Sequence, residues 1–267
     1  MKKIILLLFL LTNIFFCGAQ ELTNFRDPAT KLYGFKDKTG KIVVQPSFAA
    51  VSRESEGLIG VKQNDKWGYI DTKGMQVIAP QFDDANAFSD GMAAVGKSTT
   101  VNGYASKTSW GYIDKTGKLK IDYRFDFSSA FKNGYAIIGS DVNSLESLFG
   151  LIDKTGKEII PVKYSALEDV SEGLLLAATG NVRNYSGKYG FIDITGKEVV
   201  PFIYDGGMGF SEGLACVQKN GKSGFINKTG QVVIPFLYDG LSYFKNGKAE
   251  VYKDGKAIYI NKKGVKV

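Results

Sequence analysis

The sequence predicts an all-β protein whose tandem repeats stack into an open, curved, solenoid-like array. Three observations predict this fold class. An aromatic-Gly-aromatic-Ile-Asp-x-Thr-Gly phrase recurs in seven copies, glycines recur at three fixed positions, and each copy holds about three short strand-like segments. The repeat period is 34 to 43 residues. A fixed period of this length is typical of architectures in which each unit buries its apolar surface against its neighbours.

Residues 1–19 precede the repeats and have the pattern of a secretory signal peptide. Two lysines are followed by an apolar stretch ending at Phe16 and by small residues up to Ala19. The apolar stretch is shorter than the roughly 20 residues that a membrane-spanning helix needs. We therefore expect export to the periplasm, the cell surface or the medium, with a lipid anchor on Cys17 as the alternative. No later segment is apolar enough to span a membrane.

Residues 20–31 form a lead-in, and residues 32–267 form the array, as six full copies and a C-terminal half copy. In one copy, Trp67 to Asp71 and Gln76 to Ala79 are rich in aromatic and β-branched residues, as strands are. The Asp and the Gly between them predict a tight turn, because Asp accepts backbone amides and Gly adopts a positive φ. The turn glycines are Gly40, Gly74, Gly117, Gly156, Gly196, Gly230 and Gly264.

A third strand is expected after each hairpin. A proline often marks the end of the second strand, since proline donates no ladder hydrogen bond. An aromatic residue follows at a fixed offset, then an apolar anchor such as Phe88, then Asp-Gly, Glu-Gly or Asn-Gly, and then a segment such as Met92 to Val95. Trp67 and Trp110 share their position with Tyr, Phe, Ser and Ala, so packing between repeats is favoured over sugar stacking for both.

The phrase resembles the WG repeat family, also called KWG repeats. The most literal matches are KWGYID from Lys66 and SWGYID from Ser109, and the resemblance covers residues 32–267. It implies a bacterial, β-rich and often exported protein, and the family carries no agreed catalytic residues.

Tandem β units fit both an open array and a closed β-propeller. The first copy starts at the hairpin around Gly34, and the seventh stops at Val267 before any third strand. This arrangement favours six three-stranded sheets, each joining the last strand of one copy to the hairpin of the next, with a lone hairpin first. A propeller is the alternative.

Catalytic and metal-binding chemistry has little support. The sequence has no histidine, which excludes Ser-His and Cys-His nucleophile pairs and histidine-bearing zinc sites. The turn aspartates stand singly, whereas calcium takes six or more oxygens. We expect no enzyme activity, metal or cofactor; a hydrolase with two facing carboxylates is the alternative. The net charge of +7 comes from lysines dispersed over turns, so no nucleic-acid partner is expected.

Insertions indicate where a ligand would bind. The spacing from the third glycine of a copy to the next phrase is 11 residues in short copies but 20, 16 and 17 in three consecutive copies. Loops at one offset in stacked units project from one side. Their tips hold polar and aromatic residues suited to a sugar or peptide: Asn102, Tyr104, Lys107, Asn143, Arg183, Asn184 and Tyr185. Tolerated surface drift is the alternative, since loops accept insertions at low cost.

The sequence therefore predicts a non-enzymatic exported protein. It would act as a binding or scaffold module for a polysaccharide, a peptide or an envelope protein. A purely structural role in the envelope is the alternative.

Overall fold

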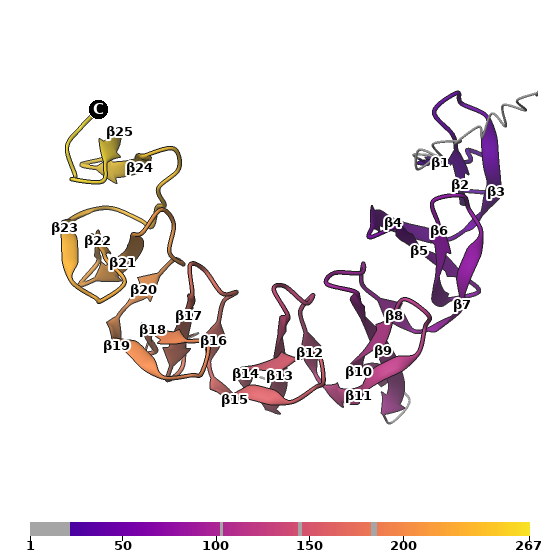
Figure 1. Cartoon of the computed structure of the whole chain (residues 1–267), viewed down its shortest axis with the longest axis horizontal. Coiled ribbons are helices and arrows are strands. Elements are labelled where there is room, and N and C mark those ends of the chain that lie inside the picture. The colour runs from indigo at the N-terminus through magenta and orange to yellow at the C-terminus, as the bar shows by residue number, and fades with distance from the viewer. Residues whose placement is uncertain (1–21, 102–103, 144–145, 183–185) are drawn as a thin grey trace, which may run out of the picture.

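The protein is an open arc of small antiparallel β-sheets. The computed structural model describes residues 22–101, 104–143, 146–182 and 186–267, and every regular element in these ranges is a strand. Figure 1 shows the sheets following one another along the arc, whose two ends stay apart. The open curved array is thus confirmed. The predicted signal peptide lies outside the described residues.

The strands of the described residues form seven sheets, which we number 1 to 7 in chain order. Sheet 1 holds β1 (Thr23–Arg26), β2 (Tyr33–Lys36) and β3 (Ile42–Phe48). Sheet 2 holds β4 (Ala50–Ser55), β5 (Leu58–Gln63), β6 (Lys66–Asp71) and β7 (Gln76–Phe82). Sheet 3 holds β8 (Asp84–Ala85), β9 (Met92–Val101), β10 (Tyr104–Asp114) and β11 (Leu119–Phe125). Sheet 4 holds β12 (Phe127–Ser128), β13 (Tyr135–Asn143), β14 (Glu146–Asp153) and β15 (Glu158–Tyr164).

The remaining sheets repeat this order. Sheet 5 holds β16 (Ala166–Leu167), β17 (Leu174–Thr179), β18 (Lys188–Asp193) and β19 (Glu198–Tyr204). Sheet 6 holds β20 (Gly206–Gly207), β21 (Ala215–Lys219), β22 (Lys222–Ile226) and β23 (Val232–Tyr238). Sheet 7 holds β24 (Lys248–Lys253) and β25 (Lys256–Asn261). We call the interface between two consecutive sheets a joint.

Each four-stranded sheet combines two copies of the repeat, as expected. In sheet 3, β8 and β9 end one copy, whereas β10 and β11 form the hairpin of the next. Two details differ from the expectation. A short strand adds a fourth strand to five of the sheets, with six residues in sheet 2 and two residues in each of sheets 3 to 6. The first hairpin is not alone either, because Thr23–Arg26 pairs with β2.

Turn chemistry fixes the hairpins. The seven turn glycines have φ between 76° and 84°, a region that other residues rarely adopt. In the turn after β6, Asp71 Oδ1 accepts hydrogen bonds from the amides of Lys73 at 2.9 Å and Met75 at 2.8 Å. The first glycine of the phrase is required for a different reason. A Cβ on Gly68 would lie 2.5 Å from Ile78 O and 2.6 Å from Pro80 N, so only glycine lets the two strands approach this closely.

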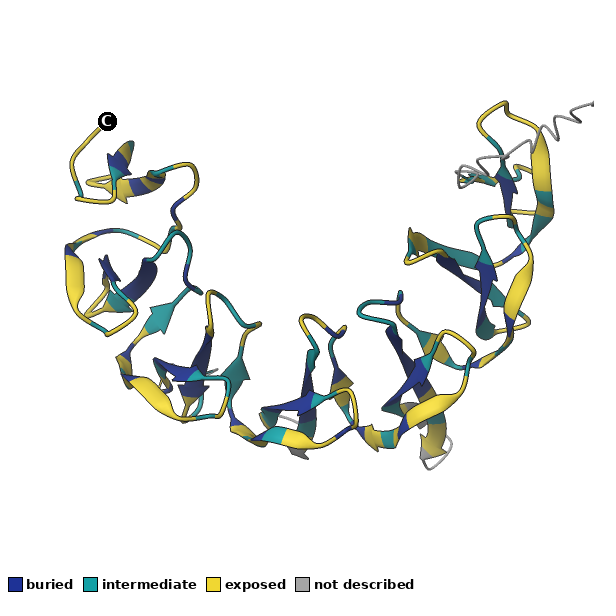
Figure 2. Ribbon diagram, in the orientation of Figure 1, coloured by how far each residue is buried: buried dark blue, intermediate teal, exposed yellow. Residues whose placement is uncertain are grey.

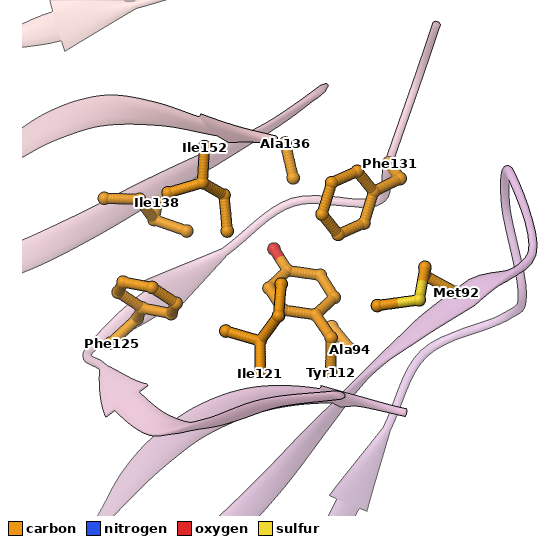
Figure 3. Close-up of a cluster of buried hydrophobic side chains, with 9 residues drawn as sticks. All are labelled: Met92, Ala94, Tyr112, Ile121, Phe125, Phe131, Ala136, Ile138 and Ile152. Atoms are coloured by element: carbon orange, nitrogen blue, oxygen red, sulfur yellow. The ribbon is translucent and has the colours of Figure 1, made fainter. Parts of the chain in front are cut away.

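The core is divided among the joints rather than gathered in one place. Figure 3 shows the joint between sheets 3 and 4, where Tyr112 of sheet 3 faces Phe131 and Ile152 of sheet 4. All three side chains are fully buried. Trp67 and Trp110 are partly buried and pack against the clusters of their own joints. Figure 2 shows exposed residues along the outer strands β7, β11, β15 and β19. The side chains that are buried are those that face a neighbouring sheet.

Three links recur at four of the joints, between sheets 2 and 3, 3 and 4, 5 and 6, and 6 and 7. The anchor ring packs on an aromatic ring of the preceding sheet: Tyr69–Phe88, Tyr112–Phe131, Phe191–Phe210 and Phe225–Phe244, with centroids 4.7 to 4.9 Å apart. A serine hydroxyl donates to the anchor carbonyl: Ser55 to Phe88, Ser89 to Phe131, Ser171 to Phe210 and Ser211 to Phe244. A carboxylate accepts from a glycine amide: Glu56 from Gly91, Asp90 from Gly134, Glu172 from Gly213 and Glu212 from Gly247.

Candidate functional site

The insertions lengthen three hairpins of sheets 3, 4 and 5. In sheet 3, β9 and β10 have 10 and 11 residues, compared with 6 in each of β5 and β6. In the short copies the same hairpin closes in a tight turn, such as Asn64 and Asp65 with φ of 49° and 61°. The first two insertions therefore extend the β-ribbon itself, and the third adds the segment between β17 and β18.

Polar contacts connect the first long hairpin to the second. Lys107 Nζ in β10 lies 2.8 Å from Asp126 Oδ1, and the amide of Asp141 in β13 donates to Asp126 Oδ2 at 3.0 Å. Partial burial of Asp126 opposes its ionisation. The hydrogen bonds from Lys107 and Asp141 outweigh burial and hold the pKa of Asp126 below its ordinary value. Asp126 is thus an ionised bridge between the two hairpins.

The second and third hairpins meet through Asn181 and Glu146. Asn181 Nδ2 donates to Glu146 Oε1 at 3.0 Å. Beside this contact lies a cleft of about 400 Å³ between β14 and the segment that follows β17. Leu148, Phe149 and Val182 give it apolar walls, and Lys163, Ser165 and Asn181 supply polar groups.

The cleft lies where an ion pair of the repeat is missing. In the hairpins of sheets 2, 5 and 6, the lysine two residues before the first glycine pairs with the aspartate that follows the fixed aromatic residue. The pairs are Lys66–Asp83, Lys188–Asp205 at 2.5 Å and Lys222–Asp239 at 2.5 Å. In sheet 4 these two positions hold Leu148 and Ser165. The substitution removes both charges and leaves an apolar wall and a hydroxyl facing the cleft.

Two side chains give the cleft its chemistry. The Phe149 ring is partly buried and meets the half-exposed Phe127 edge-on, with centroids 5.4 Å apart. Ser165 Oγ is buried and has no hydrogen-bond partner among the described residues. Buried hydroxyls are nearly always hydrogen-bonded in proteins. The Ser165 hydroxyl is therefore an unsatisfied polar group in the wall of the cleft.

The predicted site residues are only partly visible in this arrangement. Lys107 lies in β10 and contacts Asp126. Tyr104 and Asn143 lie in strands β10 and β13 near the hairpin tips. Asn102, Arg183, Asn184 and Tyr185 lie outside the described residues. Sequence reasoning missed Leu148 and Ser165, although the comparison of copies held the signal, because both depart from a Lys–Asp pair.

The described residues bring together no group of three His, Cys, Asp or Glu side chains that would hold a metal ion. Within the same ranges, no helix is long and apolar enough to cross a membrane. Cys216 is buried, and burial raises the pKa of its thiol, which disfavours the reactive thiolate.

Comparison with known proteins identifies the repeat. A family model described as "WG containing repeat" matches residues 33–67, 67–98, 110–139, 149–181, 189–222 and 224–256. No curated protein matches the chain.

Several solved structures align with most of the chain at low similarity. An uncharacterized protein from Listeria monocytogenes EGD-e has a TM-score of 0.44 and 11% identity, over 94% of this chain and 91% of that one. AztD from Citrobacter koseri has a TM-score of 0.40 and 12% identity, over 92% of this chain and 77% of AztD. A putative TolB from Agrobacterium tumefaciens has a TM-score of 0.36 and 12% identity, over 79% of this chain and 92% of that protein.

Proposed function

The chain belongs to the WG repeat family, and from that premise we propose that it is a non-enzymatic binding module whose ligand site is the cleft between the second and third long hairpins. The ligand is a short segment of an envelope glycan. The signal-like pattern of residues 1–19 supports export to the periplasm, the cell surface or the medium.

One observation carries this proposal: Leu148 and Ser165 replace the Lys–Asp pair at the point where a cleft is found. An exposed ion pair of this kind contributes about 0–1 kcal/mol, so a copy loses little stability without it. What the copy gains is an apolar surface beside a hydroxyl that has no hydrogen-bond partner in the described part of the chain. Departures from a repeat pattern are expected at functional sites.

The dimensions and chemistry fit a sugar better than an ion. A volume of about 400 Å³ lies at the lower end of the range for small-ligand pockets. Sugar rings have apolar faces that pack on aromatic side chains and hydroxyls that pair with serine, asparagine and lysine. Phe149, Ser165, Lys163 and Asn181 supply these groups.

Binding of oligosaccharides released from bacterial envelope polymers, measured by calorimetry, tests the proposal. The key variant is Leu148→Lys with Ser165→Asp, which installs the ion pair of sheets 2, 5 and 6 and fills the cleft with charge. We expect it to fold normally and to lose at least tenfold in affinity. The matched control is Lys188→Leu with Asp205→Ser, which makes the opposite exchange in sheet 5 and leaves the cleft intact.

Each outcome has a clear meaning. Binding that survives Leu148→Lys with Ser165→Asp would place the site elsewhere. A chain that binds no member of the panel would have a structural role instead. Chromatography of each oligosaccharide after incubation tests the non-enzymatic part of the proposal, and a shortened product would contradict it.

A further inference from the structure

Of the five joints between sheets 2 and 7, the one between sheets 4 and 5 lacks all three links that recur at the other four. The joint between sheets 1 and 2, at the end of the arc, differs from all of these and has Glu54 at the anchor position. Between sheets 4 and 5, Lys132 stands where the other joints have the linking serine, and Asn133 stands where they have Glu or Asp. The anchor is Val170 instead of Phe, and it faces the Leu151 position instead of an aromatic ring. Among the described residues, neither Lys132 nor Asn133 forms the hydrogen bond of its counterparts. Four substitutions thus remove three kinds of contact from one place.

The contacts that remain at this joint are apolar or exposed. Ile137, Leu151 and Ile160 of sheet 4 form a cluster with Leu175 and Ile192 of sheet 5, so the sheets stay packed. Among the described residues, the polar contacts across the joint are exposed: the Lys132–Asp169 ion pair is 3.4 Å long with more than half of each side chain exposed, and Asn181 Nδ2 donates to Glu146 Oε1 at the hairpin end. Apolar packing has no directional preference, whereas the missing hydrogen bonds fix an angle. The joint therefore holds the two sheets together but constrains their angle less than the others do.

Hollows lie at both ends of the same joint. The cleft of about 400 Å³ is at the hairpin end. A second, open hollow of about 550 Å³ lies at the other end of β13, lined by Lys132, Leu167 and Val170. Space at both ends lets the sheets tilt in either direction. In Figure 1, sheets 4 and 5 lie in the middle of the arc, where a change of angle moves both arms.

We propose that the joint between sheets 4 and 5 is the hinge of the array, and that bending there opens and closes the hairpin cleft. One wall of the cleft, with Leu148 and Phe149, belongs to sheet 4. The other wall, with Gly180 and Val182, follows β17 of sheet 5. A ligand that touches both walls fixes the angle between the two halves of the array. This last step rests on the proposed function of the cleft, whereas the hinge itself does not.

Spin-label distance measurements test the hinge without any ligand. Glu158, Glu198 and Val232 occupy the same exposed position in sheets 4, 5 and 6. Cysteines at 158 and 198 span the proposed hinge, and cysteines at 198 and 232 span a joint with all three links. Cys17 and Cys216 are replaced by alanine in both. We expect the distance distribution of the first pair to be at least twice as wide as that of the second.

Two sets of substitutions provide the controls. Lys132→Ser, Asn133→Glu, Leu151→Phe and Val170→Phe rebuild the missing links and should narrow the 158/198 distance distribution to the width of the 198/232 distribution. Ser171→Lys, Glu172→Asn and Phe210→Val remove the links between sheets 5 and 6 and should widen 198/232. Equal widths for the two pairs in the unmodified array would overturn the hinge, and this comparison needs neither set of variants to fold.

The ligand step is measured separately. Adding an oligosaccharide that binds in calorimetry should narrow the distribution of distances between the labels at 158 and 198. The distribution between the labels at 198 and 232 should stay unchanged. A bound oligosaccharide that leaves the 158/198 width unchanged would overturn the coupling between the cleft and the hinge. Absence of any bound oligosaccharide would count against the proposed function alone, because the width without ligand still decides the hinge.

Discussion

The Glu56 carboxylate of sheet 2 accepts a hydrogen bond from the Gly91 amide of sheet 3 at 3.0 Å. Lys115, on another turn of sheet 3, places its Nζ 3.0 Å from the same carboxylate. One side chain thus joins two turns of the next sheet. The same arrangement recurs with Glu172, Gly213 and Lys228, and with Glu212, Gly247 and Lys262.

Replacing Glu56 with Gln should destabilise the array in a pH-dependent way. Burial opposes ionisation of Glu56, but the hydrogen bonds from Lys115 and Gly91 outweigh it and lower its pKa from the ordinary 4.5. A carboxyl whose folded pKa is lowered stabilises the fold above the unfolded pKa, and this stability is lost as the pH falls through the folded pKa. We expect a loss of about 1 kcal/mol at pH 7, since the group is partly exposed.

Urea unfolding of both proteins at pH 7 and below pH 4 checks this prediction. The difference in the free energy of unfolding between the wild type and Glu56→Gln should shrink at the lower pH. A difference that stays constant would mean that the Glu56 charge has no part in the contact. Glu198→Gln, which removes an exposed carboxylate outside these turns, is the control for a general effect of charge.

Replacing Gly156 with Val should destabilise the protein by about 2 kcal/mol or more. Gly156 has φ of 82°, where a side chain costs about 1–2 kcal/mol. A Cβ there would also lie 3.1 Å from Ile121 Cγ2 of the preceding sheet, which adds a steric cost. Gly91→Val separates the two effects, because a Cβ on Gly91 meets nothing within 4 Å although its φ is 79°. The melting temperature should be highest for the wild type, lower for Gly91→Val and lowest for Gly156→Val. An unchanged melting temperature of Gly156→Val would contradict the turn assignment.

Much of this fold could be predicted because each turn is specified locally. The Asp and Gly of one turn fix its hairpin within a few residues, as Asp71 and Gly74 do. The strand Thr23–Arg26 was missed because it lies before the first phrase and has no counterpart to align with it. The two-residue strands were missed because pairing of such short segments is set by the neighbouring sheet, not by their own sequence.

From the sequence, the candidate site could be narrowed only to the three long hairpins. Insertion lengths identify where the chain has extra residues, but not which side chains line a cavity. Phe149 was interpreted as one more aromatic residue of the phrase, and Ser165 carried no motif of its own. Their roles follow from the absence of the Lys–Asp pair, which only becomes meaningful once the pairing of strands is known.

Replacing Val170 with Phe should stabilise the array, whereas replacing Phe131 with Val should destabilise it. Phe131 is fully buried against Tyr112, and its truncation removes an aromatic pair and leaves a cavity. The expected loss is about 2–3 kcal/mol. Val170 borders a hollow and is partly buried, so a ring there fills space, with an expected gain of about 1 kcal/mol. Denaturant unfolding checks both signs, and a loss of stability in Val170→Phe would mean that this joint cannot take the ring.

Charges on the two end faces should keep copies of the array from stacking end to end. Lys36 of sheet 1 occupies the position held by buried isoleucines in the other sheets, and its Nζ lies 4.4 Å from the centre of the Phe25 ring. Lys248 of sheet 7 stands where Leu58, Met92, Leu174 and Leu214 are buried. Repeat arrays need polar outer faces for solubility, since each unit otherwise presents a surface complementary to the next.

Glu250 of sheet 7 stands where Ala94 and Cys216 are buried. The variant Lys36→Ile with Lys248→Leu and Glu250→Ala should therefore associate more strongly than the wild type. Each substitution gives an end face the apolar character of an internal joint, where such residues are at most 8% exposed. Sedimentation velocity over a hundredfold range of concentration measures the effect. Lys38→Ile with Lys253→Leu, which changes exposed turn and strand-end lysines instead, should leave sedimentation unchanged. If both variants sediment as the wild type does, the charges on the end faces do not control association, because their removal would then leave the sedimentation of the array unchanged.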